Sequence, residues 1–293
     1  QKGRDFIKKN ILQLAIVLLG IKISFAQLAN VSIQSISIII IVFLLIFLTY
    51  LVLSKLLPLQ KELSKLLAIG TSICGVTAIM ATSSVLKSKD NDVGIAILIV
   101  IIWGSLAVLI YPFFIEWYFI SDIAKGIFLG VGIHDTSQVL AAAMVYSDLY
   151  HNDKVLEIAT ITKLLRNLFL VLLIPSLLIL KNRKENETLK NFQILKSIKS
   201  SIPLFVIGFI FLIIIRTMID VFYSNSYTWE NIIVIIENII TILFGLALTA
   251  LGASINLKKI FNQGFIPIII GMMYSIVTFF TVCILVYLLG LNL

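Results

Sequence analysis

Long apolar stretches dominate the chain, and short polar connections separate them. The stretches lack the strict alternation of a membrane β-barrel, and each has the roughly 18 or more residues that a membrane-spanning α-helix needs. The pattern therefore predicts an all-α polytopic membrane protein that forms one transmembrane domain over residues 1–293. About nine transmembrane helices are expected, near residues 10–28, 33–57, 66–86, 92–115, 124–146, 155–180, 199–222, 231–254 and 264–290.

Composition agrees with a lipid environment. The chain is 60% hydrophobic and only 13% charged, whereas a soluble domain needs a more charged surface. The net charge of +8 is scattered among short loops, which argues against nucleic-acid binding. Cys74 and Cys283 lie in apolar segments without metal-ligand spacing, so we expect free thiols, no metal and no cofactor. The chain has no phosphate-binding GxxxxGK[ST] loop, which argues against ATP-driven pumping.

Basic residues fall in alternate connections if every segment crosses the membrane. The N-terminal stretch and the 58–65, 181–199 and 255–263 connections then share one side. By the positive-inside rule, we expect a cytoplasmic N-terminus and an external C-terminus. The 87–92 connection is balanced in charge, and the 116–123 connection does not discriminate.

Two segments are poorly suited to face lipid. "IGTSICGVTAIMATSSVL" at 69–86 is rich in small residues, and "GVGIHDTSQV" at 130–139 places several polar residues inside an apolar segment. Close helix packing would explain the small residues, and that alternative stays open. Ionisable groups at membrane depth cost roughly 3 kcal/mol each and usually face a cavity. A helix broken at glycine exposes free N–H groups and a positive dipole end, which suits an anion. We therefore expect two broken helices that line a site.

The segment "VLEIATITKLLRNLFLVLLIP" at 155–175 carries a polar face at membrane depth. Thr160, Lys163, Arg166 and Asn167 lie opposite an apolar face. Two interpretations stay open: the cations are neutralised by Asp135 or Glu157, or they bind an anionic solute.

Together these patterns define a candidate site. The broken segments would supply backbone donors and hydroxyls, and the cations would supply countercharge. His134 and Asp135 form an adjacent ionisable pair, so we expect proton coupling there, with sodium at Asp135 as the alternative. The candidate binding residues are Ser72, Cys74, Gly75, His134, Asp135, Thr136, Ser137, Gln138, Lys163, Arg166 and Asn167.

A weak internal similarity suggests an inverted repeat. "LGIKISFAQLAN" at 19–30 and "LGASINLKKIFN" at 251–262 share Leu, Gly, Ile and Asn at matching offsets. The expected topology makes the two preceding helices antiparallel, as in inverted-repeat transporters. Four matches in twelve also fit chance.

Four stretches carry a family resemblance: "GTSICGVTAIMAT", "GIHDTSQVLAAA", "ITKLLRN" and "LTALGASINLKKI". They resemble the YeiH or UPF0324 family of bacterial membrane proteins, to which sulfate export has been ascribed. The resemblance runs across the chain and implies an inner-membrane location. Relatives look longer by one or two N-terminal helices, so we expect this chain to begin late. The family in turn looks related to carriers with two crossing, unwound helices, in which a panel domain and a core domain move relative to each other.

One departure from the family pattern concerns coupling. Other members often carry an acidic residue after the alanine–threonine of the "ICG" segment, where this chain has Ser83 and Ser84. If that carboxylate carries the coupling protons in other family members, this protein must carry them on another group or is not coupled to protons.

These observations predict a secondary active transporter, not an enzyme. Its expected substrate is a small anion such as sulfate, sulfite or an organic sulfonate, with coupling to protons or sodium; a homodimer is one possible assembly. A passive anion channel is the first alternative. An intramembrane enzyme is the second, although the chain has no Gly-x-Ser-x-Gly or His-Glu-x-x-His motif.

Overall fold

The computed structural model describes residues 10–22, 25–56, 61–86, 88–170, 172–173, 176–177, 204–223, 227–252 and 265–291. The regular structure in these residues is helical throughout. The chain divides into two compact units: unit 1 comprises Gln1–Ser32 and Pro203–Asn256, and unit 2 comprises Ile33–Ile202 and Leu257–Leu293. The predicted repeat at 19–30 and 251–262 and the basic 181–199 connection lie partly or wholly outside the described residues.

Unit 1 packs a short helix against two longer ones. α2 (Leu12–Leu19) and the 3₁₀ turn η2 (Gly20–Lys22) contact α12 (Leu204–Tyr223), and α2 also contacts α13 (Tyr227–Gly252). A Cβ at Gly20 would lie 2.5 Å from the Phe209 carbonyl oxygen, so glycine permits this close packing. The predicted crossing at 10–28 is not one helix, because η2 ends α2 and α3 already begins at Phe25.

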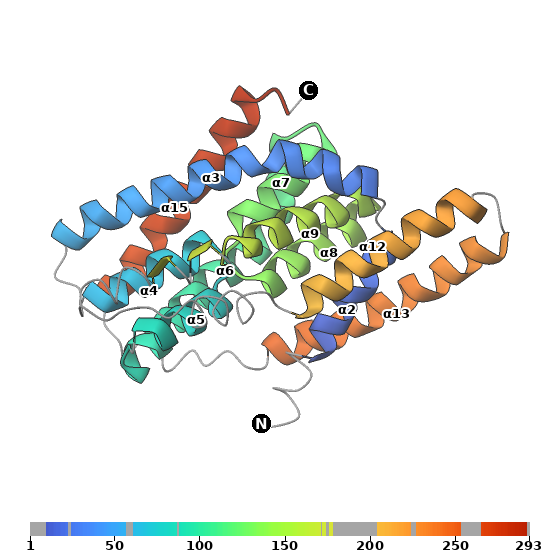
Figure 1. Cartoon of the computed structure of the whole chain (residues 1–293). Coiled ribbons are helices and arrows are strands. Elements are labelled where there is room, and N and C mark those ends of the chain that lie inside the picture. The colour runs from blue at the N-terminus through green and yellow to red at the C-terminus, as the bar shows by residue number, and fades with distance from the viewer. Residues whose placement is uncertain are drawn as a thin grey trace. The chain divides into compact units, whose positions relative to one another are not determined.

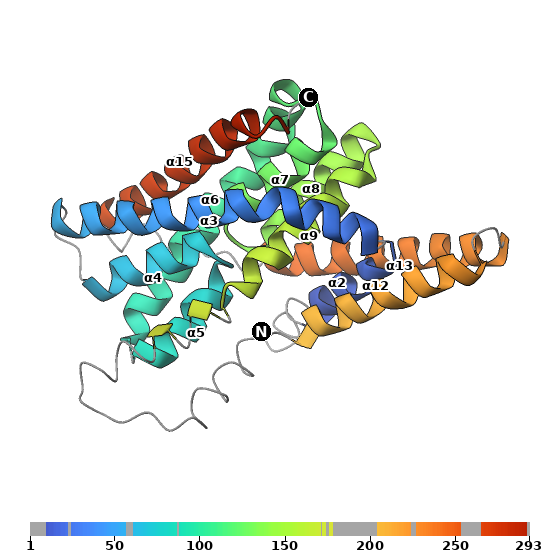
Figure 2. The ribbon, with the colours of Figure 1, turned by 45° about the horizontal axis from the view of Figure 1, so that its top comes forward.

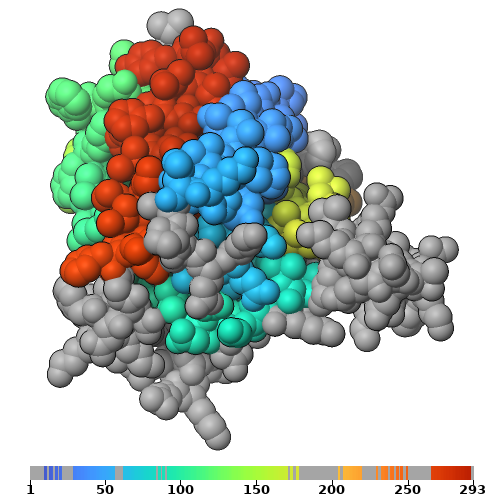
Figure 3. Space-filling model, turned by 90° about the vertical axis from the view of Figure 1, so that its left-hand side faces the viewer, coloured from blue at the N-terminus to red at the C-terminus, as the bar shows by residue number. Residues whose placement is uncertain are grey.

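Three described helices are long and apolar enough to cross a membrane. They are α3 (Phe25–Leu56), α6 (Asp90–Tyr118) and α15 (Phe265–Leu288). Trp103 Nε1 in α6 donates to the Ile268 carbonyl in α15 at 3.0 Å, and the Phe114 and Phe279 rings lie 4.9 Å apart. Residue numbers rise together along both helices, so α6 and α15 run parallel. α3 and α15 lie side by side on one face of unit 2 (Figure 3).

The segment predicted to cross at 66–86 instead folds back on itself. α4 (Lys61–Ser72) ends at a turn of Ile73, Cys74 and Gly75, and α5 (Val76–Leu86) returns (Figure 1). Gly75 has φ +60°, a conformation that glycine adopts without strain. A Cβ at Gly70 would lie 2.7 Å from the Ile79 side chain, so the two arms pack against each other. We call α4–α5 hairpin 1.

The segment predicted at 124–146 also folds back. α7 (Asp122–Gly132) and α8 (Thr136–Tyr150) are separated by Ile133–Asp135, and Asn152 Nδ2 donates to Asp122 Oδ1 at 2.8 Å. The end of α8 therefore lies beside the start of α7. We call α7–α8 hairpin 2. Figure 2 shows it with α9 (Asp153–Leu168), which packs along both arms.

Two glycines set the spacing between α7 and α9. A Cβ at Gly126 would lie 2.5 Å from the Ile158 side chain, and one at Gly130 would lie 2.6 Å from the Thr162 side chain. Both glycines face α9 because they are four residues apart, the small-residue spacing that lets membrane helices approach closely.

The bases of the two hairpins lie at opposite ends of α6. Hairpin 1 ends just before α6 starts at Asp90, and hairpin 2 starts just after α6 ends at Tyr118. Each hairpin is followed by a helix that packs along both of its arms, α6 in the first case and α9 in the second. The order of elements therefore repeats in inverted orientation, at residues other than those that sequence similarity suggested.

The fold-back of the arms, rather than the length of the whole segment, keeps these segments from crossing. Arms of 11 to 15 residues span about 16–22 Å, short of the ~30 Å apolar core of a bilayer. The prediction that 66–86 and 124–146 each cross the membrane is therefore wrong, although both are broken helices as expected. As a consequence, the 87–92 connection shares a side with 58–65, and the 116–123 connection shares a side with 147–154. Basic Lys89 now lies on the same side as Lys65, as the positive-inside rule requires.

Candidate functional site

The turns of the two hairpins meet at one point inside unit 2. A Cβ at Gly75 would lie 3.0 Å from the Cβ of Asp135. The Asp135 carboxylate accepts from the Ser137 N–H at 3.1 Å, the Ser137 hydroxyl at 2.5 Å and the Val76 N–H at 3.4 Å. Val76 begins α5 and Ser137 lies in the first turn of α8, so one carboxylate caps the N-terminal ends of both returning arms.

Lys163 binds the opposite set of helix ends. Its Nζ donates to the carbonyl oxygens of Ile73 at 3.1 Å, Ile133 at 2.9 Å and His134 at 2.5 Å. An ammonium group has three donors, and these carbonyls take all three. The side chain is 1% exposed.

Arg166, one helical turn further along α9, completes the same arrangement. Its Nε donates to the Ser72 carbonyl at 2.8 Å and its Nη2 to the Thr71 carbonyl at 2.5 Å. Its Nη1 donates to the Val131 carbonyl and, at 3.4 Å, to the Ile133 carbonyl. The guanidinium therefore joins the C-terminal end of α4 to that of α7.

The charges match the helix ends that they bind. The last carbonyls of a helix lack intrahelical partners and carry negative partial charge, whereas the first N–H groups carry positive partial charge. The two cations bind the carbonyl ends of α4 and α7, and Asp135 binds the amide ends of α5 and α8. The sequence suggested that the two cations pair with a carboxylate or bind an anionic solute. Neither interpretation describes the structure, because both cations bind main-chain oxygens. Only one Arg166 N–H is left for any solute.

His134 and Asp135 face different surroundings. The His134 ring is 2% exposed and its Nε2 lies 2.7 Å from the Ser275 hydroxyl of α15. The Asp135 side chain is partly exposed and turns toward α5 and α8. Asp135 is therefore the member of the pair that a solute can reach.

The other candidate residues divide between packing and the site. Cys74 packs with Ile73, Ala78 and Leu170, and Gln138 Nε2 donates to the Ile101 carbonyl at 2.9 Å. The Ser72 hydroxyl bonds within its own helix, to Ala68. Asn167 Nδ2 donates to Thr136 Oγ1 at 3.2 Å, which places Asn167 beside Asp135 at the start of α8.

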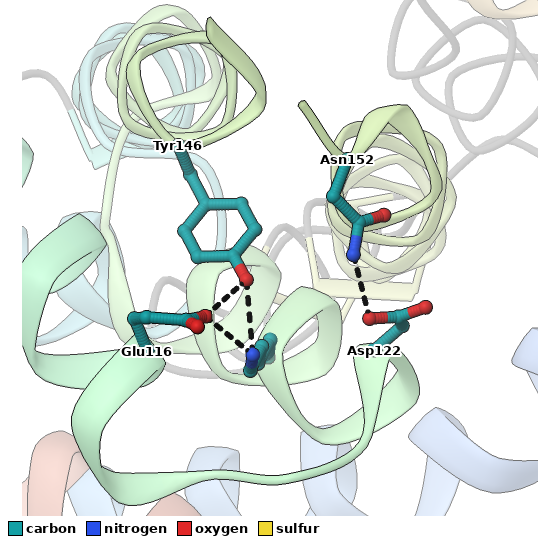
Figure 4. A network of polar contacts seen from close by, with 5 residues as sticks. Glu116, Asp122, Tyr146 and Asn152 are labelled. Atoms are coloured by element: carbon teal, nitrogen blue, oxygen red, sulfur yellow. Dashed lines mark hydrogen bonds and ion pairs between the residues drawn. The ribbon is translucent and has the colours of Figure 1, made fainter. Parts of the chain in front are cut away.

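A polar clamp that the sequence did not reveal holds the base of hairpin 2 (Figure 4). Lys125 Nζ lies 2.5 Å from Glu116 Oε2 and 3.0 Å from the Tyr146 hydroxyl. The Tyr146 hydroxyl also donates to Glu116. This clamp joins both arms of the hairpin to the end of α6. The three residues are far enough apart in sequence that no spacing pattern connects them.

Sequence similarity places the chain among known proteins. A family model described as Conserved hypothetical protein 698 matches residues 1–291. The chain belongs to this family. Its curated relatives include UPF0324 membrane proteins, which confirms the resemblance found in the sequence. One from Streptococcus pyogenes serotype M18 is 32% identical over 92% of this chain and 78% of its own length. Relatives from Fusobacterium nucleatum and Clostridium tetani are each 30% identical over 92% and 94% of this chain and 79% of their own lengths.

No solved structure matches the chain. The relatives establish that this is a bacterial membrane protein. In the described part of the chain, no cluster of three or more His, Cys, Asp or Glu side chains could hold a metal ion.

Proposed function

We propose that the protein is a cation-coupled secondary transporter of a small anion. One observation carries the proposal: the N-terminal ends of α5 and α8 meet inside unit 2, where a single carboxylate binds both of them. Transporters use the N-terminal ends of interrupted helices to bind anionic groups near the middle of the membrane. The Asp135 carboxylate already occupies that position.

The electrostatics of the site support an anionic solute. Lys163 and Arg166 place two cationic side chains at the turns, whereas Asp135 places a single carboxyl group there. Neither cation makes an ion pair with a carboxylate of the described residues, since their partners are carbonyl groups. The site therefore has a net positive charge, which an anion would balance.

The direct ligands differ from those that the sequence favoured. We assign them to the N–H groups of Val76 and Ser137 and to the hydroxyls of Thr136 and Ser137. Lys163 and Arg166 act at longer range and fix the shape of the site. These few closely spaced donors match a small oxyanion such as sulfate, sulfite or a short organic sulfonate.

Transport by purified protein in proteoliposomes tests this proposal. We expect saturable uptake of labelled sulfate or sulfite, with counterflow when unlabelled anion is present inside. Counterflow distinguishes a carrier from a passive channel, and recovery of chemically unchanged anion distinguishes it from an enzyme. If no small oxyanion shows saturable uptake under an imposed proton or sodium gradient, the proposal is wrong.

A pair of serine variants tests the location of the site. Ser137→Ala removes a hydroxyl from the site and should weaken anion binding about tenfold or more, the effect of losing one hydrogen bond to a charged group. Ser83→Ala is the matched control, because the Ser83 hydroxyl bonds within α5 to the Met80 carbonyl.

A further inference from the structure

Asp135 occupies the position that suits a substrate anion. Its carboxylate accepts three hydrogen bonds, two of them from the amide ends of different helices. A carboxylate and a small oxyanion offer the same chemistry to such donors, namely negatively charged oxygen acceptors. The Asp135 carboxylate and a substrate oxyanion cannot both bind the N-terminal ends of α5 and α8 at once, because each would need the same N–H groups.

The surroundings provide a partner beyond these N–H groups. Asn167 is 3% exposed, its amide lies against Thr136 at the start of α8, and its Oδ1 has no hydrogen-bond partner among the described residues. Rotation of an Asn amide by half a turn exchanges its oxygen and its nitrogen, so Asn167 offers either an acceptor or a donor. It is thus placed to accept from a protonated Asp135 or to donate to an oxyanion.

We infer that the substrate anion binds by displacing the Asp135 carboxylate from the α5 and α8 amide ends, and that the displaced carboxylate takes up one proton. This inference rests on the proposed function and specifies its coupling. The proton neutralises Asp135, so no carboxylate charge opposes the incoming anion. Lys163 and Arg166 keep their carbonyl partners throughout. One proton therefore accompanies each anion into the site.

The neighbours of Asp135 leave it as the proton acceptor. α9 presents Lys163 and Arg166, which already carry their full set of protons while they donate to carbonyls. Hairpin 1 presents the Cys74 thiol, and His134 points toward α15. α6 and α15 present hydroxyls on this side, since Ser105 lies against Gln138 and Ser275 lies against His134.

Proton uptake on anion binding tests the inference directly. Sulfate or sulfite is added to purified wild-type protein in weakly buffered detergent solution that contains a pH indicator. We expect about one proton taken up per bound anion, and therefore an affinity that falls about tenfold for each unit by which the pH rises. Anion binding without proton uptake would overturn the inference but leave the proposed function standing. If no anion binds at all, the proposed function itself fails.

Variants locate the proton. Asp135→Asn mimics the neutral side chain and should bind the anion without proton uptake and with affinity independent of pH. Asp148→Asn, which changes an exposed carboxylate on the same helix, should behave like the wild type. Proton uptake that persists in a folded Asp135→Asn protein would overturn the assignment. If Asp135→Asn does not fold, the wild-type stoichiometry decides alone.

Discussion

Gly75 and Asp135 touch at the meeting point of the two hairpin turns. A Cβ at position 75 would lie 3.0 Å from both the Cβ and Oδ1 of Asp135, and the φ of +60° at Gly75 disfavours any residue with a Cβ. Two independent constraints therefore require glycine at this position. The contact couples the shape of hairpin 1 to the carboxylate of hairpin 2.

Gly75→Ala should lower both stability and anion affinity. The backbone conformation alone costs an alanine about 1–2 kcal/mol, and the contact with Asp135 adds to that. Thermal unfolding in detergent measures the first effect, and anion binding measures the second. Gly94→Ala is the control, since a Cβ there meets nothing within 4 Å and α6 favours alanine. Equal stability of the Gly75→Ala and Gly94→Ala proteins would contradict the described turn.

Arg166→Gln should destabilise the fold strongly. It removes a cation that joins the carbonyl ends of two helices and leaves buried carbonyls without partners, at a cost of roughly 3 kcal/mol or more. Arg166→Lys should also fail, because an ammonium group does not reproduce the planar fork that binds α4 and α7 together. The readout is the midpoint of thermal unfolding.

Lys154→Gln is the matched control for Arg166, because it removes an exposed cation from the same helix. A variant at position 166 as stable as this control would show that the carbonyl contacts contribute nothing.

The hairpin topology predicts which loops share a side of the membrane. Single cysteines can replace the exposed residues Glu62, Lys89, Ile120 and Asp148. In intact cells, an impermeant thiol reagent should label positions 120 and 148 but not 62 and 89, which should react only after lysis. Both native cysteines are buried, which keeps the background low. Through-going helices would instead separate 62 from 89 and 120 from 148, so opposite labelling within either pair would refute the hairpins.

The clamp at the base of hairpin 2 should contribute modestly to stability. Glu116→Gln should cost about 1 kcal/mol, because the Glu116 side chain is 38% exposed and water screens its charge. Lys125→Met should cost more, since its ammonium is nearly buried among two polar partners. A double-mutant cycle in thermal unfolding checks the coupling. Strictly additive effects would mean that Glu116 and Lys125 do not interact.

The sequence predicted the breaks in the helices but not the direction of the chain after them. Gly75 and the polar run that starts at His134 marked both breaks, but Gly130 and Gly132, at which the sequence suggested the second break, lie within α7. A hydropathy pattern measures apolar length only, and two arms of 11 to 15 residues have the same apolar length as one crossing helix. The balanced charge of the 87–92 connection was the one signal against a crossing there.

The roles of the cations could not be read from the sequence either. Their position on a buried helix face was predicted, and the structure brings Lys163 and Arg166 to both breaks. Their partners are carbonyl oxygens, which every residue has, so no sequence pattern distinguishes them. Likewise, Ser275 gives no signal that it contacts His134 from a distant helix.

The cation contacts also impose an order on how the protein is made. Six carbonyl groups, from Thr71, Ser72, Ile73, Val131, Ile133 and His134, depend on two side chains of α9. A ribosome synthesises both hairpins before it reaches residue 163. Until then, each hairpin must hold its unpaired carbonyls in the inserting chain without help. The insertion of α9 is therefore the step that completes both halves at once, and a nascent chain halted before it carries two unfinished turns.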